Sequence, residues 1–171
     1  MTWSFALQAA DIQRFGNTDQ YVALQGDIQI GDADSLAQIL KNGDLLFVNS
    51  NGGSASEALK INEILSHFEN VRVIVGVDRG YRCASACAIA VLGVSKHNIF
   101  GPLDLHYGFY RHRKKGDLDP HERFYLNSVN WEITKRFIAA GLTRDQIALI
   151  QLTDRNSYQR IQFNSKPEAS G

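Results

Sequence analysis

The fold is decided by one stretch of the chain, Asp44-Leu-Leu-Phe-Val-Asn-Ser-Asn-Gly-Gly-Ser54. Its first half is a continuous apolar run, which is typical of a strand buried on both faces of a parallel sheet. Its second half is a cluster of turn-forming residues. After the turn, Ala58, Ile61, Ile64 and Leu65 recur at helical spacing. The stretch therefore predicts one strand–turn–helix unit of an α/β domain.

The same alternation continues on both sides of this unit. We expect further strands over 21–25, over 71–77 and from residue 98, and further helices over 35–40 and 84–92. This order predicts an α/β fold with a mainly parallel sheet and flanking helices. Ligands of such sheets bind where strands end and helices begin.

The last third of the chain has a different sequence pattern, which indicates helices. Asp119-Pro120 predicts a helix start, and Gly141 predicts the end of that helix. The capping box that begins at Thr143 opens a second helix. We therefore expect one domain over residues 1–163, with a helical part at about 119–152 and a disordered tail over 164–171.

Composition excludes several classes of protein. The 171 residues carry 18 basic and 18 acidic side chains, which argues against a nucleic-acid partner. No apolar run is long enough to span a membrane. The two cysteines exclude a disulfide framework and a zinc site with several Cys ligands, so we expect no metal. Residues 1–8 do not match a signal peptide; a cytoplasmic protein and an exported domain without its leader both fit the sequence.

Two junctions carry residues suited to nucleophilic catalysis. Gly52 and Gly53 follow a strand, where glycines let backbone amides face a ligand. Ser85 begins a helix, where the amide of Ala86 is available to a developing oxyanion. His106 follows 21 residues after Ser85, at the end of a short strand, and suits a general base. Each residue also has a structural interpretation, but their order favours a serine nucleophile.

Three motifs in order resemble the Clp-type serine peptidase superfamily. They are Val48-Asn-Ser-Asn-Gly-Gly-Ser54, Cys83-Ala-Ser-Ala-Cys-Ala88 and Leu105-His-Tyr107. The closer resemblance is to uncharacterised, often exported, bacterial relatives of the Clp proteolytic subunit, and it covers roughly residues 21–158. The predicted helix after His106 resembles the family's handle helix.

The resemblance implies a crotonase-like fold and a peptidase without cofactors. It assigns Ser85 as nucleophile, His106 as base, and the backbones of Gly53 and Ala86, next to Gly52, as the oxyanion site. It implies a peptide or protein substrate that binds as an added strand, and a homo-oligomer with handle-helix contacts. An ATPase partner is left unassigned.

The third triad member departs from the family pattern. The best register places Leu152 where the family has an acid. We therefore assign the role to Asp154, two positions away, ahead of Asp145, and Asn156 is a further alternative for orienting the histidine.

Three other functions stay open at this point. An inactive homologue that binds peptide or acts as a structural subunit would keep the fold and the assembly, and the imperfect position of the acid supports this alternative. A crotonase-type enzyme acting on an acyl-coenzyme A thioester would need an acid at the site, and we expect the nearest, Glu57, to be exposed. A Ser–Lys dyad would need Lys60 or Lys96 as base, and neither is well placed.

Two further groups of residues are ambiguous. We expect Cys83 and Cys87 to be small buried thiols; the alternatives are a disulfide, feasible if Cys83 precedes the helix, and a competing nucleophile. The basic run 111–115 fits a solvated loop. The aromatic residues Phe124, Trp131 and Phe137 fit core or subunit contacts.

Overall fold

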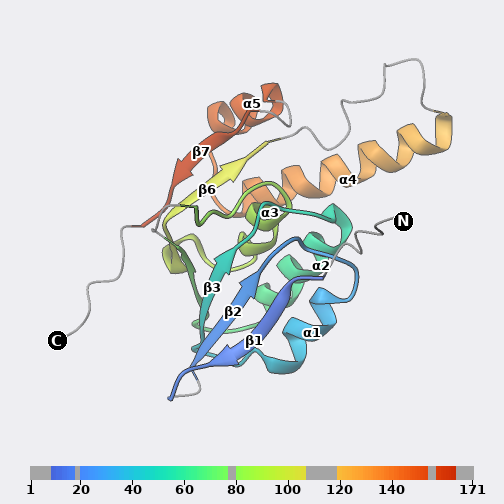
Figure 1. The fold of residues 1–171 in the computed structure, drawn as a ribbon. Helices are drawn as coiled ribbons and strands as arrows, with labels where there is room; N and C mark the ends of the chain where they lie inside the picture. Colours follow the sequence, from blue (N-terminus) through green and yellow to red (C-terminus); the bar gives the residue numbers. More distant parts are fainter. Residues whose placement is uncertain (1–8, 18–19, 77–79, 107–118, 154–156, 165–171) are drawn as a thin grey trace, which may run out of the picture.

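The main sheet has five strands. The structure is a computed structural model that describes residues 9–17, 20–76, 80–106, 119–153 and 157–164 (Figure 1). The strands lie in chain order: β1 (Asp11–Phe15), β2 (Tyr21–Gln25), β3 (Leu45–Asn49), β4 (Arg72–Val75) and β5 (Ile99–Phe100). β1 pairs antiparallel with β2, and all other pairs are parallel. The predicted mainly parallel α/β fold is confirmed.

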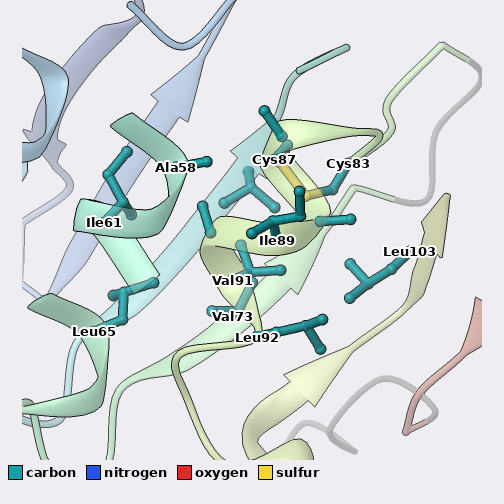
Figure 2. Close-up of a cluster of buried hydrophobic side chains, with 14 of the residues drawn as sticks. Ala58, Ile61, Leu65, Val73, Cys83, Cys87, Ile89, Val91, Leu92 and Leu103 are labelled. Atoms are coloured by element: carbon teal, nitrogen blue, oxygen red, sulfur yellow. A yellow bond between two sulfur atoms is a disulfide. The ribbon is translucent and has the colours of Figure 1, made fainter. Parts of the chain in front are cut away.

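Three helices bury one face of this sheet. They are α1 (Asp32–Ile39), α2 (Ala55–Ser66) and α3 (Ala86–Val91). Alternate residues of each strand point to opposite faces, and one set, which includes Leu46 and Val73, is buried in a single hydrophobic cluster with the helices. Figure 2 shows α2 and α3 side by side within this cluster. The core therefore holds the ends of β3 and α3 at fixed positions.

The other face of the sheet is open. It carries a cavity of about 630 Å³, whose apolar lining includes Phe15, Phe47, Ile74 and Tyr81. The rings of Phe15 and Phe47 lie 5.7 Å apart. Among the described residues, helices therefore cover this sheet on one side only.

A second layer stands over the carboxyl end of the sheet. It contains a two-stranded antiparallel sheet, β6 (Pro102–Leu105) with β7 (Gln159–Gln162), and the helices α4 (Pro120–Ala139) and α5 (Arg144–Leu152). A short 3₁₀ helix, η1 (Lys96–Asn98), precedes β5. The two helices predicted from their caps are confirmed. Buried Asn62 joins the layers, since its amide donates to the Ile89 carbonyl at 2.8 Å and its oxygen accepts from Arg136 at 2.9 Å.

Some elements differ from the sequence prediction. β1 and β7 are polar, with alternate residues exposed, so no apolar run marks them. Asn164, where we expected the tail to begin, is ordered and forms a bridge with Phe100; residues 165–171 lie outside the described part. Within that part, no helix is long and apolar enough to cross a membrane.

Because α1 packs on the sheet with one face, substitutions on its buried and exposed faces should change the free energy of unfolding by very different amounts. Leu36 is fully buried, whereas Gln38 on the same helix is exposed. We expect Leu36→Ala to lower the free energy of unfolding by about 2–5 kcal/mol and Gln38→Ala to change it by less than about 0.5 kcal/mol. Urea denaturation followed by circular dichroism measures both; equal effects would contradict the described packing.

Candidate active site

The site is built around residues 82–87, here called the serine turn. Its first half is extended and lies between two neighbours. On one side the Ser50 amide donates to the Arg82 carbonyl at 2.8 Å, and the Ala84 amide donates to the Ser50 carbonyl at 3.0 Å. On the other side the Ser85 amide donates to the Asp104 carbonyl at 2.9 Å. The turn is therefore an extra strand between the end of β3 and β6.

Ser85 adopts a backbone conformation that side chains rarely adopt. Its φ is 58° and its ψ is −122°, directly before α3. Such a conformation costs about 1–3 kcal/mol and persists only where the surroundings impose it. A serine on a strained strand-to-helix turn is the arrangement that exposes the nucleophilic hydroxyl in α/β-hydrolases.

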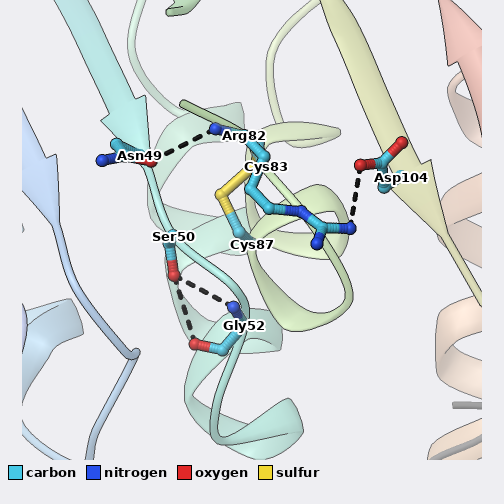
Figure 3. The surroundings of a disulfide bond; sticks show 7 residues. All are labelled: Asn49, Ser50, Gly52, Arg82, Cys83, Cys87 and Asp104. Atoms are coloured by element: carbon cyan, nitrogen blue, oxygen red, sulfur yellow. Dashed lines mark hydrogen bonds and ion pairs between the residues drawn. A yellow bond between two sulfur atoms is a disulfide. The ribbon is translucent and has the colours of Figure 1, made fainter. Parts of the chain in front are cut away.

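Gly52 packs directly against Ser85. A Cβ at Gly52 would lie 2.8 Å from Ser85 Cβ and 3.0 Å from Ser85 Oγ, which is too close for any side chain. The amide of Gly52 is already occupied, because it donates to Ser50 Oγ at 3.1 Å (Figure 3). Gly52 therefore admits the serine side chain but does not offer a free donor.

Gly53 and Ala86 offer the amides that Gly52 lacks. Gly53 bridges to Ile28, and a Cβ there would lie 2.2 Å from the Ile28 carbonyl oxygen. That bridge uses the Gly52 carbonyl and the Ser54 amide, not the Gly53 amide. Within the described ranges, neither the Gly53 amide nor the Ala86 amide donates a hydrogen bond. Two free backbone donors are what an oxyanion hole requires, so these amides are the candidates for that role.

His106 comes directly after the strand that contains Asp104, whose carbonyl accepts a hydrogen bond from the Ser85 amide. It follows β6, two positions after Asp104, and it is buried. Its ring meets the ring of Tyr158 edge-on at 5.0 Å. The structure thus ties His106 to the serine turn through β6.

A charged cluster beside His106 was not predicted from the sequence. The buried carboxylate of Asp104 accepts two hydrogen bonds from Arg160, at 2.7 and 2.9 Å, and one from Arg82 at 3.0 Å. The Arg82 guanidinium lies 4.6 Å above the Tyr158 ring. Hydrogen bonds from Arg160 lower the pKa of Asp104 most, and the charge of Arg82 lowers it further. Burial of the carboxyl group raises the pKa, but the net result is a pKa below the ordinary value. Sequence spacing carries no signal for this cluster, because its members come from three separate segments.

The predicted third member lies outside the described residues. Asp154 and the alternative Asn156 belong to 154–156, which the structure does not describe. Leu152, which the sequence resemblance aligned with the acid, is the last residue of α5 and is 73% exposed. Asp145 is exposed in the first turn of α5, so it belongs to the helix start. The assignment of Asp154 therefore stays a prediction.

The expectation of two free thiols was wrong, because Cys83 and Cys87 form a disulfide (Figure 3). Cys83 lies on the extended part of the serine turn and not on α3, which begins at Ala86. The chain reverses at Ser85, so the two Cα atoms approach to 5.2 Å. Both cysteines are buried. The competing-nucleophile alternative is thereby excluded for the oxidised chain.

The expected exposure of Glu57 was also wrong. Its carboxylate is buried and accepts hydrogen bonds from the Gly31 amide at 3.0 Å, the Ala33 amide at 2.9 Å and Lys60 at 3.1 Å. Burial raises its pKa, but these donors together lower it below its ordinary value. Glu57 is thus a cap for α1, and Lys60 is its ion-pair partner. Neither side chain has the role that a crotonase acid or a lysine base would need.

The remaining positions considered from the sequence are Lys96 and the basic run 111–115. Lys96 is exposed in η1, and its side chain approaches Gly141. The basic run 111–115 lies outside the described residues. Among the residues the structure describes, no group of three or more His, Cys, Asp or Glu side chains is placed to hold a metal ion.

The fold, with a serine turn over the carboxyl end of a parallel sheet and a helical second layer, is Clp-protease-like. Among solved structures, it is similar to a mutant of ClpP1 from Listeria monocytogenes, with a TM-score of 0.58 and 20% sequence identity over 76% of this chain and 77% of that chain. No protein-family model and no curated protein matches the sequence. The structural likeness establishes the fold.

The Asp104 cluster predicts loss of stability in acid. A pKa that is lowered on folding adds stability that is complete above about pH 4, the range of an unfolded aspartate, and is lost as the pH falls through the folded pKa. We expect Asp104→Asn to lower the free energy of unfolding by about 1–3 kcal/mol at neutral pH and the difference from the wild type to shrink below about pH 4. Urea denaturation across this range measures it.

Glu132→Gln is the matched control, since Glu132 pairs with Lys135 and Arg136 on the surface of α4. Solvent screens such pairs, so this variant should change stability little at any pH. A difference for Asp104→Asn that is the same in acid and at neutral pH would contradict the assigned ionisation.

Proposed function

We propose that the chain is a serine hydrolase that cleaves peptide bonds. One observation carries the proposal: Ser85 sits on a strained turn with its side chain against Gly52. The next amides along the chain from Gly52 and from Ser85, those of Gly53 and Ala86, donate no hydrogen bond within the described residues. The Clp-protease-like fold supports a peptide as the substrate class.

In this proposal Ser85 Oγ attacks the scissile carbonyl carbon while His106 accepts its proton. The amides of Gly53 and Ala86 donate to the oxyanion of the tetrahedral intermediate. His106 then protonates the leaving amine, which departs and leaves an acyl-enzyme. A water molecule, deprotonated by His106, releases the acid and restores Ser85. The cycle needs no cofactor.

We assign the orientation of the His106 imidazole to Asp154. A carboxylate there would hold the imidazole in one tautomer and stabilise the imidazolium. The edge contact with Tyr158 supports the same orientation, because the ring limits the rotation of the histidine. Asp104 is engaged by two arginines, so it does not compete for this role.

We also propose that the chain assembles as a homo-oligomer through α4. Phe137 on this helix is buried in the core, whereas Phe124 is 77% exposed and Trp131 is 59% exposed. Large aromatic side chains left in solvent on one helix mark a surface for another protein chain. A second copy is the partner that the Clp-like fold favours.

An inactive homologue is the second candidate. It is favoured by Leu152, which puts an apolar, exposed side chain where the family has its acid. A crotonase-type activity is not favoured, because Glu57 is committed to capping α1. Serine reactivity separates the first two candidates.

Labelling with a fluorophosphonate probe, read by intact mass, tests the proposed nucleophile. We expect one adduct on the wild type, none on Ser85→Ala, and a labelling rate lower by about 10²–10⁴-fold on His106→Ala, because the base is lost. Lys60→Met and Lys96→Met are controls that should label at the wild-type rate. A well-folded wild type that takes no adduct would favour the inactive homologue.

The rate of labelling by the fluorophosphonate probe also tests Asp154, the proposed third member of the catalytic triad. We expect Asp154→Ala to slow labelling by orders of magnitude, about 10²–10⁴-fold, because the histidine loses its orienting carboxylate. Asp145→Ala, in the exposed first turn of α5, serves as the control and should have no effect. Wild-type labelling by Asp154→Ala together with slow labelling by Asn156→Ala would transfer the role to Asn156.

A further inference from the structure

We propose that the Cys83–Cys87 disulfide positions the nucleophile, so that Ser85 reaches full reactivity only when this bond is formed. The inference rests on the proposed function, because it takes Ser85 as the nucleophile. Cys83 and Cys87 are positioning residues in this account: they act through the backbone of the serine turn and need not touch the substrate.

The disulfide links the two halves of the serine turn across Ser85. Cys83 is fixed on the extended half, where its carbonyl accepts from the Asp104 amide at 3.0 Å. Cys87 lies in the first turn of α3, where its amide donates to the Ala84 carbonyl at 3.1 Å. The bond therefore closes a loop of five residues, 83–87, with the strained serine at its centre.

The loop leaves Ser85 little room to relax. A disulfide requires its two Cα atoms to stay within about 4.4–6.8 Å, and here they lie 5.2 Å apart. Rotation of Ser85 to an ordinary negative φ would redirect the chain on one side of it and carry Cys83 and Cys87 apart. The bond thus opposes the motion that would release the backbone strain.

The start of α3 has no support from a capping side chain. The helix has only six residues, and the side chain of its N-cap, Ser85, makes no capping hydrogen bond. Helices this short are not stable by themselves, since nucleation is costly. A serine used as a nucleophile must keep its hydroxyl free of a cap. The disulfide supplies the restraint that a capping side chain supplies elsewhere.

Burial of Cys83 and Cys87 protects the disulfide from reduction. Both sulfur-bearing side chains pack in the hydrophobic cluster, near Ile89 and Leu103 (Figure 2). A dithiol reductant would give two electrons and two protons to form two thiols and would itself become a disulfide, but it reaches the bond only when the serine turn opens. Such a bond fits a chain that works in an oxidising compartment.

The test compares the labelling rate constants of three proteins with the fluorophosphonate probe: the wild type, Cys83→Ala/Cys87→Ala, and Leu36→Ala. Leu36 is buried in α1, far along the chain from the serine turn, so this variant controls for lost stability alone. All rates are taken at a temperature at which every protein is folded by circular dichroism. We expect the double variant to label about ten- to a hundredfold more slowly, in line with the strain that is released, and Leu36→Ala to label at the wild-type rate.

Hydrogen exchange gives a readout that does not depend on activity. In the double variant, amides of residues 85–91 should exchange faster than in the wild type, while those of β2 and β3 should not change. Labelling of the double variant at the wild-type rate would overturn the positioning role and leave the proposed function intact. Unchanged exchange over 85–91 would also overturn it. A wild type without an adduct, combined with faster local exchange in the double variant, would instead overturn the proposed function and retain the structural restraint.

Discussion

The pairing of the serine turn between Ser50 and Asp104 is the constraint on which the site depends. Hydrogen bonds on both edges hold residues 82–84 extended, and α3 must begin two residues later because the hydrophobic core receives its side chains. Ser85 absorbs the change of direction at a φ of 58°. Gly52 has no side chain because Ser85 fills that space. The strain at Ser85 and its close packing on Gly52 therefore both follow from the geometry of the sheet end, and the Cys83–Cys87 disulfide spans the same turn.

The second layer places His106, the proposed base, next along the chain from a strand that pairs with this turn. β6 pairs with the serine turn on one edge and with β7 on the other, so the residue after β6, His106, is carried to the site by backbone pairing. Asp104 secures the arrangement, since its buried carboxylate joins Arg82 of the turn to Arg160 of β7. Tyr158 contacts both Arg82 and His106. Asp104 therefore stabilises the scaffold of the site and stays bound to its arginines.

The sequence predicted the elements whose signals are local. The apolar run of β3, the turn glycines and the caps of α4 and α5 were all readable from spacing, and they place Ser85 correctly at a helix start. The sequence did not predict β1 and β7, because these strands are polar and carry no apolar run. It also did not predict the Asp104 cluster, because Asp104 and Arg160 are 56 positions apart in the chain. The disulfide depended on the residue at which α3 begins, and helix ends are the least reliable part of such predictions.

The proposed mechanism depends most on the Gly53 and Ala86 amides, which would receive the oxyanion formed at Ser85. A crystal structure of the chain bearing a phosphonate adduct tests this claim most directly. We expect the adduct on Ser85 Oγ, with one phosphonyl oxygen about 2.7–3.1 Å from both amide nitrogens. An adduct on Ser85 whose phosphonyl oxygen points to solvent, or an adduct on any other residue, would contradict the account.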